Sequence, residues 1–319
     1  MTATLPADVQ RVFDRFVTTE LTTVDASGQP ITWPVTPYYT PGAGAIDLTT
    51  GIGYPKKADD AVRNPHVSLL FSDPTGSRLE DPCAVLVQGT AHVDDQNLES
   101  NAERYFRESG EKLPATKSMH PPAFLRRRMA WYYIRLYIYV RPERVFVWPG
   151  GDFSQEPTLY GARVDEVRTQ HSVEPEVPPP PPEGGSAAWD DRMDELGRRH
   201  RTAVLSVVGP DGFPLSSRVE IEPDRAGGRV RLGDLPDWMP ASPSRACLTA
   251  HEHDPDFKWQ ANFQVRGDLL GQSGDWSFVP HKFVGGFELP KSRLQAYREN
   301  FGKMLRYRKK AKEELARRR

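Results

Sequence analysis

The sequence predicts a mainly β protein with helices, built from two small β-barrel units in tandem. Short runs of β-branched and aromatic residues alternate with turn formers along most of the chain, which is typical of antiparallel strands. The same order of strands and turns occurs twice, and a proline-rich stretch separates the two occurrences. The length of 319 residues also favours two domains over one.

The boundary between the units is predicted at a run of five consecutive prolines, Pro178–Pro182, followed by Glu-Gly-Gly-Ser. Consecutive prolines favour an extended chain and donate no backbone hydrogen bonds, so no packed element is expected there. We therefore expect a first barrel domain over residues 1–170, a linker over 171–188 and a second, degenerate barrel domain over 189–319.

Each unit begins with a predicted hairpin, a strand followed by a glycine-containing turn and a second strand. Later strands also correspond between the copies. The first copy has them at 21–24, 31–35, 46–48, 67–71, 85–89 and 141–145, and the second at 203–208, 215–219, 230–232, 246–250, 263–267 and 279–283. Five or six short strands in each copy favour a small closed or partly closed barrel.

Helices are expected as additions to this repeat. The first copy carries two, over 95–111 and 121–135, where good helix formers or an apolar stripe at helical spacing occur. The second copy ends in a predicted helix over 291–319, which is basic from Arg306 onward. Glu313 and Glu314 stand at helical spacing from lysines there, which favours a self-paired exposed helix.

One segment of the first copy has the composition of an anion site. A predicted strand ends in Thr49 and Thr50, a loop with two glycines follows, and Lys56 and Lys57 open a short helix after a proline. Helix N-termini bind phosphate through free backbone N–H groups, and lysines add charge-assisted hydrogen bonds. From the residues alone, two lysines on a solvated helix start remain the alternative.

The order of these motifs resembles a known family. A hairpin, the threonine-ended strand, Lys56-Lys57-Ala58, Arg63-Asn64-Pro65 and the strand Val67–Phe71 occur together. This arrangement, continued at 85–91 and 140–145, resembles the pyridoxamine 5'-phosphate oxidase-like superfamily of flavin-binding split β-barrels. The resemblance implies two FMN-binding split barrel-like domains in tandem.

By this resemblance, Thr49, Thr50 and Lys57 would hold the cofactor phosphate, with Lys56 and Arg63 as further candidates. The flavin ring would lie along the strand Pro34-Val35-Thr36. The family builds its site between two barrels, so the tandem copies would form an intramolecular pseudo-dimer, and a further homodimer is left open. The second copy has no lysine between Leu232 and Ala246, so a second site of this kind is not expected.

The function implied is that of an FMN-dependent oxidoreductase acting on an unidentified small molecule, with no catalytic residue assigned. Two alternatives stay open: a reductase that uses a deazaflavin coenzyme, and a non-catalytic carrier or sensor of flavin or haem. Vitamin-forming oxidase activity is not expected, because Ile31-Thr32-Trp33-Pro34-Val35 stands where the true oxidases have a basic, arginine-rich strand.

Composition narrows the partners further. A formal net charge of −1 gives no reason to expect a nucleic-acid partner, and no run of eighteen apolar residues indicates a membrane span. We expect a cytoplasmic protein in which Cys83 and Cys247 are reduced. His251-Glu252-His253-Asp254 is expected to be a solvated turn, and no metal site is assigned.

Overall fold

The computed structural model describes residues 5–113, 129–161, 189–239, 242–272, 274–286 and 293–318. The predicted linker 171–188 and most of the helix expected over 121–135 lie outside these residues. No helix in the described part combines the length and the apolarity needed to cross a membrane. Cys83 and Cys247 are both free and buried.

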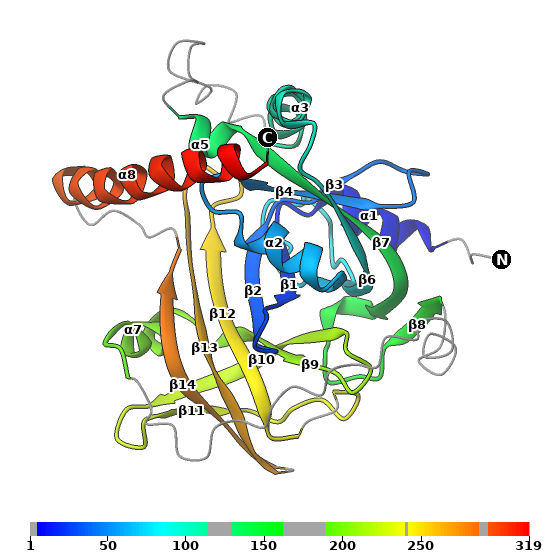
Figure 1. The fold of residues 1–319 in the computed structure, drawn as a ribbon. Coiled ribbons are helices and arrows are strands. Elements are labelled where there is room, and N and C mark those ends of the chain that lie inside the picture. The colour runs from blue at the N-terminus through cyan, green and yellow to red at the C-terminus, as the bar shows by residue number, and fades with distance from the viewer. Residues whose placement is uncertain are drawn as a thin grey trace.

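The first half forms an eight-stranded sheet in the order β2-β1-β5-β6-β7-β4-β3, with β8 paired to β7 (Figure 1). Its elements are α1 Ala7–Arg15, β1 Thr19–Val24, β2 Pro30–Val35, β3 Tyr38–Tyr39, β4 Ile46–Gly51, α2 Lys56–Arg63, β5 His66–Phe71, β6 Ala84–Asp94, α3 Leu98–Lys112, α5 Ala130–Tyr133, β7 Arg135–Trp148, η2 Pro149–Gly151 and β8 Thr158–Gly161.

The second half forms a closed barrel in the order β10-β11-β14-β13-β12-β9. Its elements are α7 Arg192–Arg199, β9 Thr202–Val208, β10 Pro214–Asp224, β11 Arg229–Leu232, β12 Ser244–His253, β13 Gln260–Gln272, β14 Asp275–Gly285 and α8 Arg293–Arg317. The mainly β fold with two barrel-type sheets and added helices is therefore as the sequence predicted.

The internal repeat extends to the hydrogen-bond register. Thr22 pairs with Thr32 in the first hairpin, and Ser206 pairs with Ser216 at the corresponding place in the second. The bulge between the long strands also recurs, with Gly89 opposite Pro142 in one half and Gly267 opposite Pro280 in the other.

Both bulges require glycine. A Cβ on Gly89 would lie 2.2 Å from the carbonyl oxygen of Arg141, and one on Gly267 would lie 2.1 Å from that of Val279. Real Cβ atoms do not approach a backbone oxygen so closely. The two glycines therefore perform the same steric task in the two copies.

The halves differ in how the barrel closes. In the second half β10 is continuous, and its end pairs with β11 through Glu222 and Arg231. In the first half the corresponding strand is interrupted after Val35 and resumes at Tyr38, which pairs with Asp47 of β4. Pro37 lies in the interruption, where a residue without an N–H group cannot continue the ladder.

The observed helices agree with one of the two helix predictions for the first copy and differ from the other. The helix expected over 95–111 is confirmed as α3. The one expected over 121–135 is wrong at its end, because α5 stops at Tyr133 and Arg135 begins the long strand β7. The repeat also starts earlier than predicted, since α1 buries Val9 and Val12 where α7 buries Met193 and Leu196.

The two halves pack face to face through buried hydroxyl groups. Thr22, Thr32, Ser206 and Ser216 lie within hydrogen-bond distance of one another, with the shortest separation, 2.7 Å, from Thr32 Oγ1 to Ser206 Oγ. These positions correspond in the two copies, so each half contributes the same pair of residues. Four hydroxyl side chains, one on each of β1, β2, β9 and β10, thus form a buried contact in which they hydrogen-bond to one another.

Candidate functional site

The residues from Thr49 to Lys57, here called the lysine segment, have the local structure that the sequence predicted. Strand β4 ends at Gly51, a loop follows, and α2 begins at Lys56 directly after Pro55. The Thr50 hydroxyl donates a hydrogen bond to the carbonyl oxygen of Tyr54 at 3.0 Å, which fixes the loop. Thr49 lies on the same strand, half-buried and paired with Tyr137 of β7.

Lys56 and Arg63 point to a carboxylate of their own helix. Asp60 is buried, with Lys56 Nζ 3.0 Å and Arg63 Nη2 2.7 Å from its oxygens. Lys56 Nζ also lies 3.6 Å from Asp25 of the first hairpin. The charges of these two residues are therefore balanced within the protein.

Lys57 has no such partner. No carboxylate among the described residues forms an ion pair with it, and its Nζ lies 5.8 Å from the ring centroid of Trp33 and 5.7 Å from that of Tyr54. Burial, together with the nearby charge of Arg135, lowers the pKa of Lys57 to about 8. A half-buried ammonium group with no carboxylate partner among the described residues is a candidate contact for an anionic ligand.

Arg135 is a second buried cation that the sequence analysis missed. It is only 5% exposed, and its guanidinium lies 3.9 Å from the ring centroid of Tyr105 and 4.2 Å from that of Tyr132. Its Nη1 donates to the Tyr54 hydroxyl at 3.3 Å, and its buried Nε has no hydrogen-bond partner in the described part of the chain. No carboxylate in the described part of the chain pairs with it either.

A signal for Arg135 was present in the sequence but ambiguous. The run from Trp131 to Tyr139 contains aromatic residues both at helical spacing and in alternation, and the first pattern led to a predicted helix. Strand β7 pairs Arg135 with Gly51, which places it beside the end of β4 where the lysine loop starts. Only the strand register brings the two together.

Aromatic rings surround the loop of the lysine segment. Trp131 and Tyr307 stack with centroids 5.3 Å apart and an interplanar angle of 26°, and the Tyr54 ring meets Tyr307 edge-on at 5.4 Å. Tyr307 comes from α8, at the far end of the sequence. This group of planar side chains is of the kind that packs against planar, partly apolar ligands.

The residues Pro34-Val35-Thr36, predicted as one strand, end β2 at Val35 and leave Thr36 in the interruption that follows. All three residues are half-buried, and Val35 packs against the core of the first half. Trp33 precedes them on β2 and is the residue of this strand that Lys57 approaches. A Cβ on Gly286 of the second half would lie 2.9 Å from the Trp33 ring, so the second half contacts the strand here.

The expected turn at His251–Asp254 is wrong. His251 and His253 lie on β12, buried against the first half, and His251 Nε2 is 2.7 Å from the buried Glu20 carboxylate. Arg218 Nη2 lies 3.2 Å from the same carboxylate oxygen. Because β12 continues through these residues, their side chains join the contact between halves. Within the described ranges, no group of three or more His, Cys, Asp or Glu is arranged to hold a metal.

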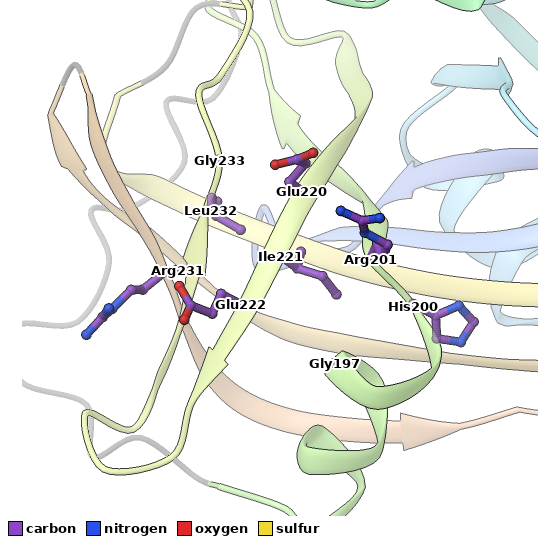
Figure 2. A pocket seen from close by; sticks show the side chains of 9 residues that line it. All are labelled: Gly197, His200, Arg201, Glu220, Ile221, Glu222, Arg231, Leu232 and Gly233. Carbon is purple, nitrogen blue, oxygen red and sulfur yellow. The ribbon is translucent and has the colours of Figure 1, made fainter.

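A cavity of about 300 Å³ lies elsewhere, beside α7 and β10 of the second barrel (Figure 2). At the spacing that aligns Leu21 with Leu205, Gly197 and His200 of its lining replace Phe13 and Phe16. In the first half those phenylalanines are fully buried. The cavity therefore lies where the first half has buried aromatic side chains, and it is formed by none of the predicted site residues.

Comparisons with known proteins give structural neighbours only. No family model and no curated protein matches the sequence. A conserved hypothetical protein of Mycobacterium tuberculosis is 20% identical over 47% of this chain and 87% of its own, with a TM-score of 0.35. An F420 reductase is 17% identical over 44% of this chain and 98% of its own, with a TM-score of 0.33.

A third neighbour is a candidate pyridoxamine 5'-phosphate oxidase from Listeria innocua. It is 18% identical over 44% of this chain and 94% of its own, with a TM-score of 0.31. Each of the three is thus matched along most of its own length by about half of this chain. One of them bears the name of the family that the sequence resembles.

Proposed function

We propose that the protein binds one flavin mononucleotide per chain at the lysine segment and acts as a flavin-dependent oxidoreductase. The observation that carries the proposal is Lys57, a half-buried ammonium group near the rings of Trp33 and Tyr54 that has no carboxylate partner among the described residues. Arg135, equally without a carboxylate, adds a second cation beside Tyr54. A phosphate monoester supplies the negative charge that this pair lacks.

The aromatic residue on the predicted flavin strand supports a flavin in particular. Trp33, which directly precedes Pro34, presents its ring near Lys57, and a flavin is planar and partly apolar. Once bound, a flavin supplies hydride exchange, so the protein needs to bind it, orient it and exclude water. No acid or base is assigned to the reaction.

The proposal of one flavin site per chain is supported by the second half, which lacks a lysine segment. The segment that corresponds to the lysine loop carries Trp238 instead, which donates a hydrogen bond from Nε1 to the carbonyl oxygen of Phe153 at 2.8 Å. Its ring lies 4.8 Å from that of Trp148, across the contact between halves. Tryptophan packing thus takes the place of a second anion site.

The adjacent lysines provide a matched test. Lys57→Ala should weaken FMN binding by about 1.5–3 kcal/mol, roughly 10- to 150-fold, because a charge-assisted contact is lost. Lys56→Ala should leave the affinity within about twofold, since Lys56 is already paired with Asp60. Fluorescence titration with FMN measures both. Equal effects of the two substitutions would contradict the assignment.

The cofactor and the activity are tested on the unmodified protein. Parallel titration with a deazaflavin coenzyme separates the two cofactors, and binding of the deazaflavin alone would replace FMN in the proposal. Reduction by nicotinamide donors followed by reoxidation with quinones or nitro compounds tests turnover. An FMN complex that turns over no acceptor would make the protein a carrier or sensor.

A further inference from the structure

The C-terminal helix α8 reaches from the second half to the lysine segment of the first. Arg317 Nη2 lies 2.9 Å and Arg318 Nη2 lies 2.6 Å from the Asp59 carboxylate, in α2. Arg318 is 6% exposed at its side chain and also pairs with Asp95, just after β6. The prediction of an exposed, self-paired helix is therefore wrong at its C-terminal end, where Glu314 is buried and the arginines pair with the first half. Figure 1 shows α8 lying beside α5, on the side of the molecule where its C-terminal end meets the first half.

The middle of α8 closes tightly on the loop. Tyr307 contacts Tyr54 and Trp131, and its Cβ would lie 3.1 Å from a Cβ placed on Gly53. The same added atom would lie 3.0 Å from the carbonyl oxygen of Trp131, which accepts a hydrogen bond from the Gly53 N–H at 2.9 Å. The absence of a side chain at Gly53 lets the helix come this close.

Tyr54 connects this contact to both cations. One edge of the residue meets Tyr307, its hydroxyl accepts the hydrogen bond from Arg135, and Lys57 Nζ lies over its ring. The hydroxyl remains protonated at neutral pH, because burial raises the pKa of Tyr54 to about 12. A displacement of Tyr54 would therefore alter the surroundings of Lys57 and Arg135 together.

We infer that α8 forms part of the phosphate subsite and that Tyr307 is a positioning residue, which holds Tyr54 between the two cations. The inference rests on the proposed function and extends it to the second half of the chain. A site held in its binding geometry avoids the entropy cost of ordering side chains when the ligand arrives. Without Tyr307, this entropy cost would reduce the free energy gained when the cofactor phosphate binds.

Substitutions in the full-length chain test this. Tyr307→Ala should weaken FMN binding about tenfold, through the loss of two ring contacts. Riboflavin, which lacks the phosphate, should bind within about twofold of its original affinity. Tyr307→Phe keeps the ring and should bind FMN as the unmodified protein does. Leu305→Ala is the matched control, because Leu305 lies on the same helix and is 48% exposed.

The comparison of FMN with riboflavin separates the possible failures. If the unmodified protein binds both equally, the phosphate site and hence the proposed function are wrong. If it prefers FMN and Tyr307→Ala keeps that preference, weakening both flavins alike or neither, the role of α8 is wrong. Should Tyr307→Ala fail to fold, Tyr307→Leu removes the ring contacts while keeping an apolar side chain, and should give the same selective loss of FMN affinity.

Discussion

At the scale of single residues, the site depends on which of two adjacent lysines lacks a partner. Successive residues of a helix point about 100° apart, so Lys56 meets Asp60 and Asp25 while Lys57 turns toward Trp33. The sequence predicted the segment and its helix but could not rank the two lysines. Asp60 stands four residues after Lys56 on the same helix, but Trp33, the ring that Lys57 faces, comes from another strand and is placed beside it only by the fold.

The pKa of Lys57 predicts how FMN binding depends on pH. The lysine carries its charge below about pH 8, so FMN affinity should fall about tenfold between roughly pH 7.5 and 9.5 as the charge is lost. Titrations across this range measure the decline, and Lys57→Met should show a much flatter profile. An unchanged pH dependence in that variant would remove Lys57 from the phosphate site.

The stability of the cofactor-free protein should respond with the opposite sign. The folded state releases the Lys57 proton near pH 8, whereas in the unfolded chain the lysine holds it to about 10.5. Because the unfolded state then binds more protons, this group makes the free energy of unfolding rise with pH across that window. Loss of the same Lys57 proton as pH rises therefore increases the free energy of unfolding and weakens anion binding.

At the scale of elements, the positions of the strands in the two copies were largely predictable, while the boundary of β7 was not. Hairpins with glycine turns specify their own register. Gly89 and Gly267 align between the copies in the sequence, but the bulge that they share is seen only in the structure. The run from Trp131 to Tyr139 was ambiguous because its aromatic residues suit both a helix and a strand. Pairing with β4, a tertiary contact, makes the residues from Arg135 onward a strand.

The bulge glycines should be equally intolerant of change in the two halves. Gly89→Ala and Gly267→Ala each force a methyl group onto a backbone oxygen, and each should lower the free energy of unfolding by about 3–5 kcal/mol. Gly302→Ala is the control, because none of the described atoms outside its own helix backbone lies within 4 Å of its added Cβ on α8. Denaturant unfolding measures all three, and a mild effect at either bulge would contradict the steric argument.

At the scale of the whole molecule, the sequence suggested two separate cores, whereas the structure joins them. Leu70, Leu86 and Trp148 of the first half belong to the hydrophobic cluster of the second barrel. The hydroxyl cluster at their contact was not foreseeable, because serine and threonine on strands usually indicate solvent exposure. They can be buried here because each finds its partner on the other half.

The shared core predicts that the two halves unfold together. Tryptophan fluorescence and far-UV circular dichroism should follow one coincident transition in denaturant. Asp211→Asn should lower its midpoint without splitting it, because Asp211 of the second hairpin lies 2.6 Å from the buried Arg144 of the first half. Removing one partner of such a pair costs about 3–5 kcal/mol, since an uncompensated charge stays buried. Two separate transitions, or an Asp211→Asn effect seen by only one of the two probes, would mean that the halves unfold independently. In that case the contact between the halves would not hold the proposed site together.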